Sequence, residues 1–246
     1  MKLFPAIDLY DGCAVRLYKG DYQQMTVYSH HPEELTASFE EKGAACLHLV
    51  DLEGAKSGAT PNMNTIKKIL AHTSLYTELG GGIRSLHTID AYLSAGIDRL
   101  ILGTAAITEP GFVQSAIRQF GAESIAVSVD IKEEKVAIKG WTQVTDIGCD
   151  DFLKEMESIG VQTVICTDIS KDGAMKGTNR LLYQRLSETY PIQIIASGGV
   201  SSLDDIRALT EMNLYGAILG KALYTGAIDL AEAVRIASRS ERSQTK

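Results

Sequence analysis

The feature that most constrains this chain is a repeat of its first half in its second. An apolar run from Ile194 to Ser197 leads into the glycine pair Gly198 and Gly199, and the same pattern occurs 117 residues earlier. The offset holds across two elements, and it relates Gly81 to Gly198, Gly82 to Gly199, Gly103 to Gly220, Ile89 to Ile206 and Leu102 to Leu219. Chance does not keep register over that distance, so we interpret the chain as two copies of one half that close a shared core.

Eight short apolar runs alternate with segments of helical spacing. They begin near Leu3, Leu47, Leu75, Leu100, Ile125, Val164, Ile194 and Gly216. Such alternation with short connections predicts a parallel sheet with right-handed crossovers. The length of 246 residues fits one (β/α)8 TIM barrel, which has roughly 250. An open doubly wound sheet is the alternative, but it leaves the twofold repeat unexplained.

We therefore expect an α/β chain with a single domain over residues 1–246, built from two repeated (βα)4 halves. The first strand, Leu3 to Leu9, is expected to lead into a polar loop that contains Gly12 and Gly20. The last residues, 238–246, are polar and are expected to fray.

Composition excludes several classes of function. The formal net charge of −7 argues against a nucleic-acid or anionic-membrane surface, which needs a basic excess. The N-terminus has no apolar signal segment and no run approaches the length of a membrane span, so a cytoplasmic protein is expected. The four cysteines form no Cys-x-x-Cys pair and the five histidines show no metal-ligand spacing. With no dinucleotide fingerprint either, we expect no metal and no cofactor, and we expect a monomer.

The repeated glycines predict two phosphate sites. In a (β/α)8 barrel the loops after strands seven and eight often hold phosphate, and Gly198, Gly199 and Gly220 occupy those positions, with Lys221 beside them. The repeat predicts a matching cradle after strands three and four, formed by Gly81, Gly82, Gly103 and Thr104, with Arg84 close by. Glycines that merely turn a strand into a helix are the simpler explanation, but their duplication at both phosphate positions favours binding.

The two cradles lie four strands apart, on opposite sides of the barrel mouth. The expected ligand is therefore an elongated small molecule with a phosphate at each end.

Asp8 and Asp130 end strands one and five, which are also opposed, and each carboxylate is expected to reach the middle of that ligand. An aspartate at a strand end often caps the following loop, an interpretation that applies more strongly to Asp51, Asp168 and Asp172. Two carboxylates without a cofactor suit proton transfer in an aldose to ketose isomerisation. One of them must act as an acid, which requires its pKa to rise by roughly 3 from about 3.9, and burial supplies shifts of that size.

Two further side chains are candidates for ligand contact. Trp141, the only tryptophan, follows strand five between glycine and polar residues, where it would stack on a planar ring of the ligand rather than enter the core. Arg16, in the first loop, would clamp a phosphate, with simple solvent exposure as the alternative.

Several motifs together resemble one family. They are Pro5-Ala6-Ile7-Asp8-Leu9, Val15 to Tyr22, Gly80-Gly81-Gly82-Ile83-Arg84, Ala196 to Val200 and Gly220 to Tyr224. Over nearly the whole chain the sequence resembles the phosphoribosylformimino-5-aminoimidazole carboxamide ribotide isomerases of histidine biosynthesis. The resemblance implies an Amadori rearrangement of a bisphosphate aminoaldose, with Asp8 as general base and Asp130 as general acid. It also implies that Thr167 assists and that Asp172 is a nearby polar residue.

Three alternatives remain open. The sister cyclase of the pathway shares the half-barrel repeat, but it usually carries a cysteine where Ala6 stands and lacks the motif that begins at Gly220. A dual isomerase that also accepts phosphoribosylanthranilate would need an extra cation for the carboxylate, and Lys139 is the residue on offer. A barrel that binds phosphorylated metabolites without catalysis would have no need of both Asp8 and Asp130.

Overall fold

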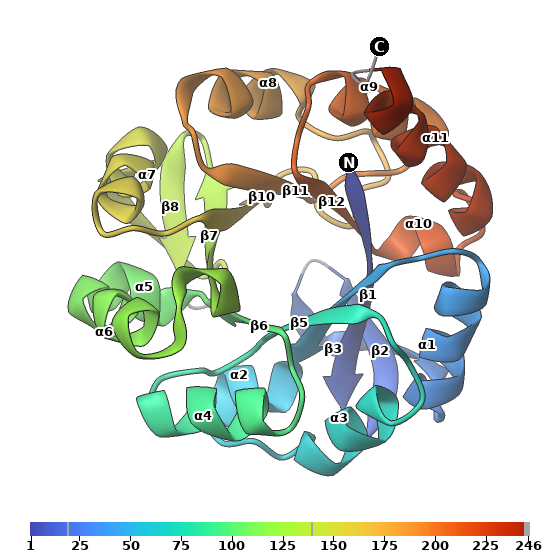
Figure 1. Ribbon diagram of the computed structural model, residues 1–246, viewed down its shortest axis with the longest axis horizontal. Helices are drawn as coiled ribbons and strands as arrows, with labels where there is room; N and C mark the ends of the chain where they lie inside the picture. Colours follow the sequence, from blue (N-terminus) through green and yellow to red (C-terminus); the bar gives the residue numbers. More distant parts are fainter. Residues whose placement is uncertain (19, 139, 244–246) are drawn as a thin grey trace.

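The computed structural model describes residues 1–18, 20–138 and 140–243 and shows a closed barrel of eight parallel strands (Figure 1). Each strand pairs in parallel with the next, and the last pairs back with the first. In order around the barrel they are β1 (Lys2–Tyr10), β4 (Cys46–Asp51), β5 (Tyr76–Gly80), β6 (Arg99–Leu102), β7 (Ile125–Lys132), β10 (Thr163–Asp168), β11 (Gln193–Ser197) and β12 (Gly216–Leu219). The predicted (β/α)8 fold is confirmed.

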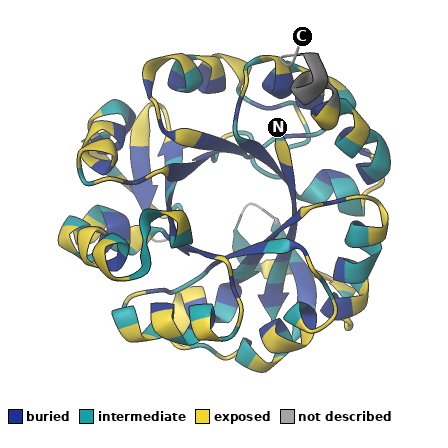
Figure 2. Ribbon diagram, in the orientation of Figure 1, coloured by how far each residue is buried: buried dark blue, intermediate teal, exposed yellow. Residues whose placement is uncertain are grey.

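Helices surround the barrel and turn their buried faces toward the strands (Figure 2). They are α1 (Pro32–Glu41), α2 (Leu52–Ser57), α3 (Met63–Leu70), α4 (Leu86–Ser94), α5 (Thr104–Thr108), α6 (Pro110–Phe120), α7 (Cys149–Ser158), α8 (Arg180–Thr189), α9 (Leu203–Glu211), α10 (Lys221–Tyr224) and α11 (Leu230–Ser243), with a short 3-10 turn at Ala122–Ser124. The repeat extends to the helix caps, because Ser85 and Ser202 each accept a hydrogen bond from the backbone three residues on. No helix among the described residues has the length and apolar character needed to cross a bilayer.

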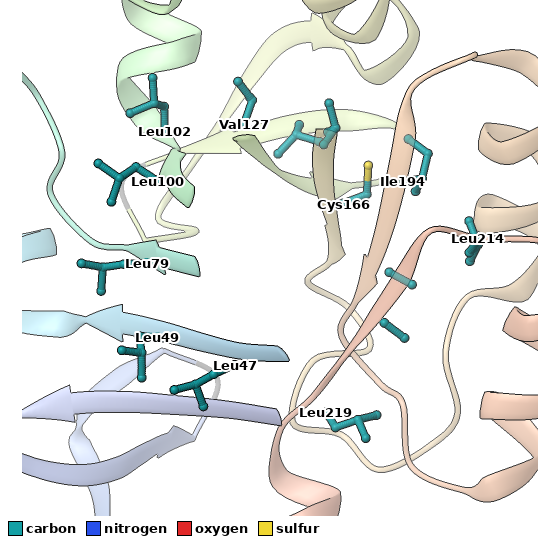
Figure 3. Packing of buried hydrophobic residues seen from close by; sticks show 14 of the residues in the cluster. Leu47, Leu49, Leu79, Leu100, Leu102, Val127, Cys166, Ile194, Leu214 and Leu219 are labelled. Atoms are coloured by element: carbon teal, nitrogen blue, oxygen red, sulfur yellow. The ribbon is translucent and has the colours of Figure 1, made fainter. Parts of the chain in front are cut away.

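Successive side chains of a strand point to opposite faces, so the barrel has two apolar layers. The larger layer fills the space between strands and helices, where Leu47, Leu79 and Leu100 are fully buried (Figure 3). The smaller layer fills the barrel interior with Phe4, Ala6, Cys46, Ile101, Ala126, Ile165, Ile195 and Ile218.

An ion-pair network occupies the N-terminal end of the barrel interior. Glu78 has no exposed side-chain surface and Arg99 only 2%. The Arg99 Nε donates to Glu78 Oε2 over 3.1 Å, and His48 Nδ1 lies 2.7 Å from the other carboxylate oxygen. The Arg99 guanidinium also lies over the rings of Tyr76 and Tyr215. This end of the barrel is filled by paired charges and aromatic rings, so the functional mouth is the opposite end.

Two hairpins extend the barrel where loops were expected. After β1 the chain forms β2 (Cys13–Tyr18) and β3 (Asp21–Ser29), so the prediction of a polar loop there is wrong. After β7 it forms β8 (Lys135–Ile138) and β9 (Gln143–Gly148). The turn from β1 to β2 and the turn from β7 to β8 each consist of two residues with positive φ. This conformation suits the twist of paired strands. At the other end of the chain, the expected tail begins inside α11, and residues 244–246 lie outside the described part.

Candidate active site

The two aspartates proposed as acid and base lie at the same end of the barrel on opposite sides. Asp8 is near the end of β1 and Asp130 near the end of β7, with three strands between them in either direction. Phe4 and Ala6 face the barrel interior, so the strand alternation directs Asp8 to that same side at the mouth.

Asp8 is paired with Arg16. Arg16 Nη1 donates to Asp8 Oδ2 over 2.8 Å, and the two side chains are only 17% and 14% exposed. Burial disfavours the charged guanidinium, but Asp8, Tyr224 and Asp172 outweigh that effect and raise the pKa of Arg16 above its ordinary value. The structure thus places Arg16 on the carboxylate of Asp8.

The environment of Asp130 is different. Burial raises its pKa to about 6, although hydrogen bonds from Trp141 and Thr167 oppose the rise, and the nearby charge of Asp172 adds to it. Thr167 lies on β10 directly opposite Asp130 in the strand register. A carboxyl group with this pKa holds a proton over a pH range in which an ordinary aspartate has lost it.

Asp172 interacts electrostatically with both proposed catalytic aspartates, Asp8 and Asp130. Burial raises its pKa, Arg16 and Lys221 oppose the rise, and Asp8 adds to it. Lys221 reaches the same loop, since its Nζ donates to the carbonyl oxygen of Gly173 over 3.3 Å. Asp172 therefore lies among Asp8, Arg16 and Lys221.

The paired glycines have a packing role of their own. A Cβ on Gly82 would lie 1.8 Å from the carbonyl oxygen of Gly54, and a Cβ on Gly199 would lie 2.6 Å from that of Gly177. Both glycines, like Gly81 and Gly198 beside them, have positive φ. The simpler interpretation of the glycines thus holds in part, because they let each loop pack against the backbone of its neighbour. Their contact with phosphate stays a prediction.

Gly103 and Gly220 precede the short helices α5 and α10, and neither position supplies a side-chain cap. The backbone N–H groups of Thr104 and Lys221 stand at the starts of these helices, the position suited to an anion. A Cβ on Gly103 would lie 3.0 Å from Ser128 Oγ, a hydroxyl that the sequence did not single out.

Arg84 contacts α2, the helix against which Gly81 and Gly82 also pack. Its exposed guanidinium donates to the carbonyl oxygen of Ala55 over 2.9 Å and lies against Gly58, where it holds the end of α2.

The sequence analysis did not predict a pair of equivalent Asp–Asn hydrogen bonds, one in each half of the barrel. Asp51 caps α2 by accepting from the Gly54 N–H, and it also accepts from Asn62 Nδ2 over 2.8 Å. Asp168 accepts from Asn179 Nδ2 over 2.7 Å. Asn62 and Asn179 are separated by the same 117 residues as the glycines, so the repeat itself contained the signal. The capping interpretation of Asp51 and Asp168 is confirmed.

The tips of the two hairpins meet over the mouth. A Cβ on Gly20, at the turn between β2 and β3, would lie 3.5 Å from the ring of Trp141, at the turn between β8 and β9. The Tyr22 hydroxyl anchors the first hairpin by donating to the Leu52 carbonyl over 3.0 Å. Trp141 is thus at the mouth of the barrel and not in the core. At the mouth it would face a bound ligand. Lys139, the cation considered for a second substrate, lies outside the described residues.

Potential metal ligands gather at one place in the described part of the chain. His31, Glu33 and Glu34 bring one ligand atom each within 4.8 Å of the others at the start of α1. Glu33 already pairs with Lys68 over 2.5 Å, and no polar group of the barrel mouth takes part. The cluster has no connection to the proposed acid and base.

Comparison with known proteins agrees with this geometry. The family model described as "Histidine biosynthesis protein" matches residues 2–229. A relative from Clostridium botulinum (strain Kyoto / Type A2) is 46% identical over 97% of this chain and 98% of its own. Relatives from Oceanobacillus iheyensis and Lactococcus lactis subsp. lactis are 49% and 48% identical, over 94% and 97% of this chain and 96% and 100% of theirs.

All three relatives are named as isomerases of a 1-(5-phosphoribosyl) imidazole-4-carboxamide that carries a (5-phosphoribosylamino)methylideneamino group at position 5. The family match spans almost the whole barrel and includes both Asp8 and Asp130. The chain belongs to the histidine biosynthesis protein family.

Proposed function

We propose that this protein is an intramolecular isomerase of histidine biosynthesis, which converts the aminoaldose phosphoribosylformimino aminoimidazole carboxamide ribotide to its aminoketose by an Amadori rearrangement. The observation that carries the proposal is the pair of opposed carboxyl groups in unlike environments. Asp8 is ion-paired with Arg16 over 2.8 Å, while burial raises the pKa of Asp130 to about 6. The names of the relatives support the choice of substrate.

We infer the roles of the two carboxyl groups from these unlike environments. Asp130 donates its proton to the ring oxygen of one ribose, the bond from that oxygen to C1 breaks, and the nitrogen lone pair forms an iminium ion. Asp8 then removes the proton from C2 and leaves an enolamine with a hydroxyl at C2. The enolamine becomes the ketone when Asp8 returns its proton to C1 and the C2 hydroxyl gives its own proton to the Asp130 carboxylate. Thr167 donates to Asp130 and keeps its carboxyl group directed at the reacting ring.

The two glycine cradles would hold the phosphates. The start of α5, with Gly103 and Thr104, takes one phosphate, and the start of α10, with Gly220 and Lys221, takes the other. Trp141 would cover the imidazole ring from the hairpin tip. Fixing both ends orients the reacting ribose, which acid and base catalysis alone does not achieve.

We further propose that the protein works in the cytoplasm as a monomer. Large exposed apolar side chains are few among the described residues, and they are Val27 and Tyr28 on β3, Val144 and Ile147 on β9 and Leu181 on α8. A small number of such side chains is normal on a monomer surface.

The test is a turnover assay with the purified aminoaldose in the absence of ammonia, run beside phosphoribosylanthranilate. The proposal expects the aminoketose to form from the first substrate. Turnover of both substrates would identify a dual isomerase. No turnover of either, with binding intact, would refute the proposal and favour a binding protein.

A further inference from the structure

We infer that Tyr224 is a positioning residue that holds Arg16 against Asp8, the base in the proposed function on which this inference rests. Tyr224 is the last residue of α10, the short helix that Gly220 precedes. Its part in the site comes through contacts with the arginine and with the strand that carries Asp8.

Tyr224 is itself firmly fixed. Its hydroxyl donates to the carbonyl oxygen of Ala6 over 2.8 Å, two residues before Asp8 on the same strand. Its ring packs against the ring of Tyr28 on β3, with centroids 4.6 Å apart. The ring is thus tied both to β1 and to the first hairpin.

The Arg16 guanidinium lies over this fixed ring. Its Cζ is 5.3 Å from the Tyr224 ring centroid, within the range of a cation–π contact. The same guanidinium donates to Asp8 from Nη1. The Arg16 guanidinium therefore contacts both residues. Its face lies over the Tyr224 ring, and its edge donates to the Asp8 carboxylate.

Two further observations show that this placement is specific. A Cβ on Gly220 would lie 2.3 Å from Arg16 Nη2, so the guanidinium occupies space that only glycine leaves open. Arg16 Nε is buried and has no hydrogen-bond partner among the described residues. Hydrogen bonds alone therefore leave the guanidinium incompletely held, and the ring supplies the remaining support.

The contact matters because arginine has a long side chain with many rotamers. Without the ring, Arg16 would leave Asp8 for part of the time, and the base would lose both its orienting partner and its compensating charge. Tyr224 would then affect proton transfer at C2 without touching the substrate.

The first test needs no substrate. Arg16 in the free protein is modified with phenylglyoxal, and the rate is followed by mass spectrometry of its peptide, with the exposed Arg118 as internal reference. Tyr224→Leu is expected to raise the Arg16 rate about fivefold, the scale of a lost cation–π contact. Tyr224→Phe keeps the ring but loses the hydroxyl bond to Ala6, so its rate is expected to lie between those of the wild type and Tyr224→Leu. Equal rates in all three proteins would overturn the inference, and Tyr224→Met replaces Tyr224→Leu if the latter does not fold.

The second test is a double-mutant cycle on kcat with Tyr224→Leu and Arg16→Met. If Tyr224 acts through Arg16, the double variant has the kcat of Arg16→Met alone, whereas a merely structural role makes the two losses multiply. Multiplying losses would overturn the inference. A wild-type protein that does not turn over the aminoaldose would instead refute the proposed function, and the modification rates would still decide the role of Tyr224.

Discussion

Replacing Asp130 by asparagine is expected to raise the free energy of unfolding relative to the wild type, and this difference is expected to grow as the pH rises. Burial raises the pKa of Asp130 from 3.8 to about 6, so the folded state binds this proton more tightly than the unfolded state. The resulting stabilisation is complete below the unfolded pKa and is lost as the pH rises through about 6. At 1.36 kcal/mol per pKa unit, the loss amounts to about 3 kcal/mol. Asparagine does not titrate, so the variant avoids that loss.

The measurement is the free energy of unfolding in urea for both proteins at about pH 4.5 and about pH 7.5. The variant minus wild-type difference should grow by about 1–3 kcal/mol between these values, whatever the cost of the changed hydrogen bonds to Trp141 and Thr167. Asp8→Asn is the matched control, because it leaves the charge of Arg16 without its carboxylate and should destabilise the protein instead. A difference for Asp130→Asn that stays constant or shrinks with rising pH would refute the reasoning.

Three other predictions test the site and its support. Asp8→Asn and Asp130→Asn should each lower kcat by about 10²-fold or more while the substrate still binds in equilibrium dialysis, and near-normal turnover would remove the residue from the mechanism. The bisphosphate should bind at least about tenfold more tightly than an analogue that lacks one phosphate, as measured by calorimetry, and equal affinities would eliminate one cradle. Gly82→Ala should lower the stability by more than about 2 kcal/mol in thermal unfolding, because its Cβ would lie 1.8 Å from the Gly54 oxygen, whereas Gly111→Ala on α6, with no atom within 4 Å, should be neutral or slightly stabilising. Equal effects of the two glycine variants would contradict the packing role.

The repeat made most of the fold predictable. An offset of 117 residues specified two matching halves, and the strand ends placed Asp8 and Asp130 on opposite sides of one mouth. The same offset relates Asn62 to Asn179, which support Asp51 and Asp168. That pair was available from the sequence, but an asparagine within a loop has many uses, and only the structure shows what it holds.

The hairpins were less predictable. Asp11 and Gly12 form a two-residue turn of favoured composition, so the first hairpin had a visible signal. The second turn uses Glu133 and Glu134, both with positive φ, a conformation that glutamate seldom adopts. There the pairing of the strands determines the turn, and a single sequence does not reveal it.

The role of Arg16 was hidden for a different reason. The local sequence shows only that Arg16 follows the first barrel strand. The position of its guanidinium beside Asp8 depends on the space left by Gly220, which lies more than 200 residues away in the chain. The pKa of Asp130 likewise depends on burial by several distant segments, which no local pattern reports.

The filled N-terminal end of the barrel has a kinetic consequence. With Arg99, Glu78 and the rings of Tyr76 and Tyr215 packed there, the route to the reacting groups runs through the mouth, past the tips of the two hairpins. Product must therefore depart along the same path by which the next substrate arrives. Under the proposed function, product bound at the two cradles excludes the next substrate. We therefore expect product inhibition to be competitive with the substrate, and the rate of the enzyme to fall as its product accumulates.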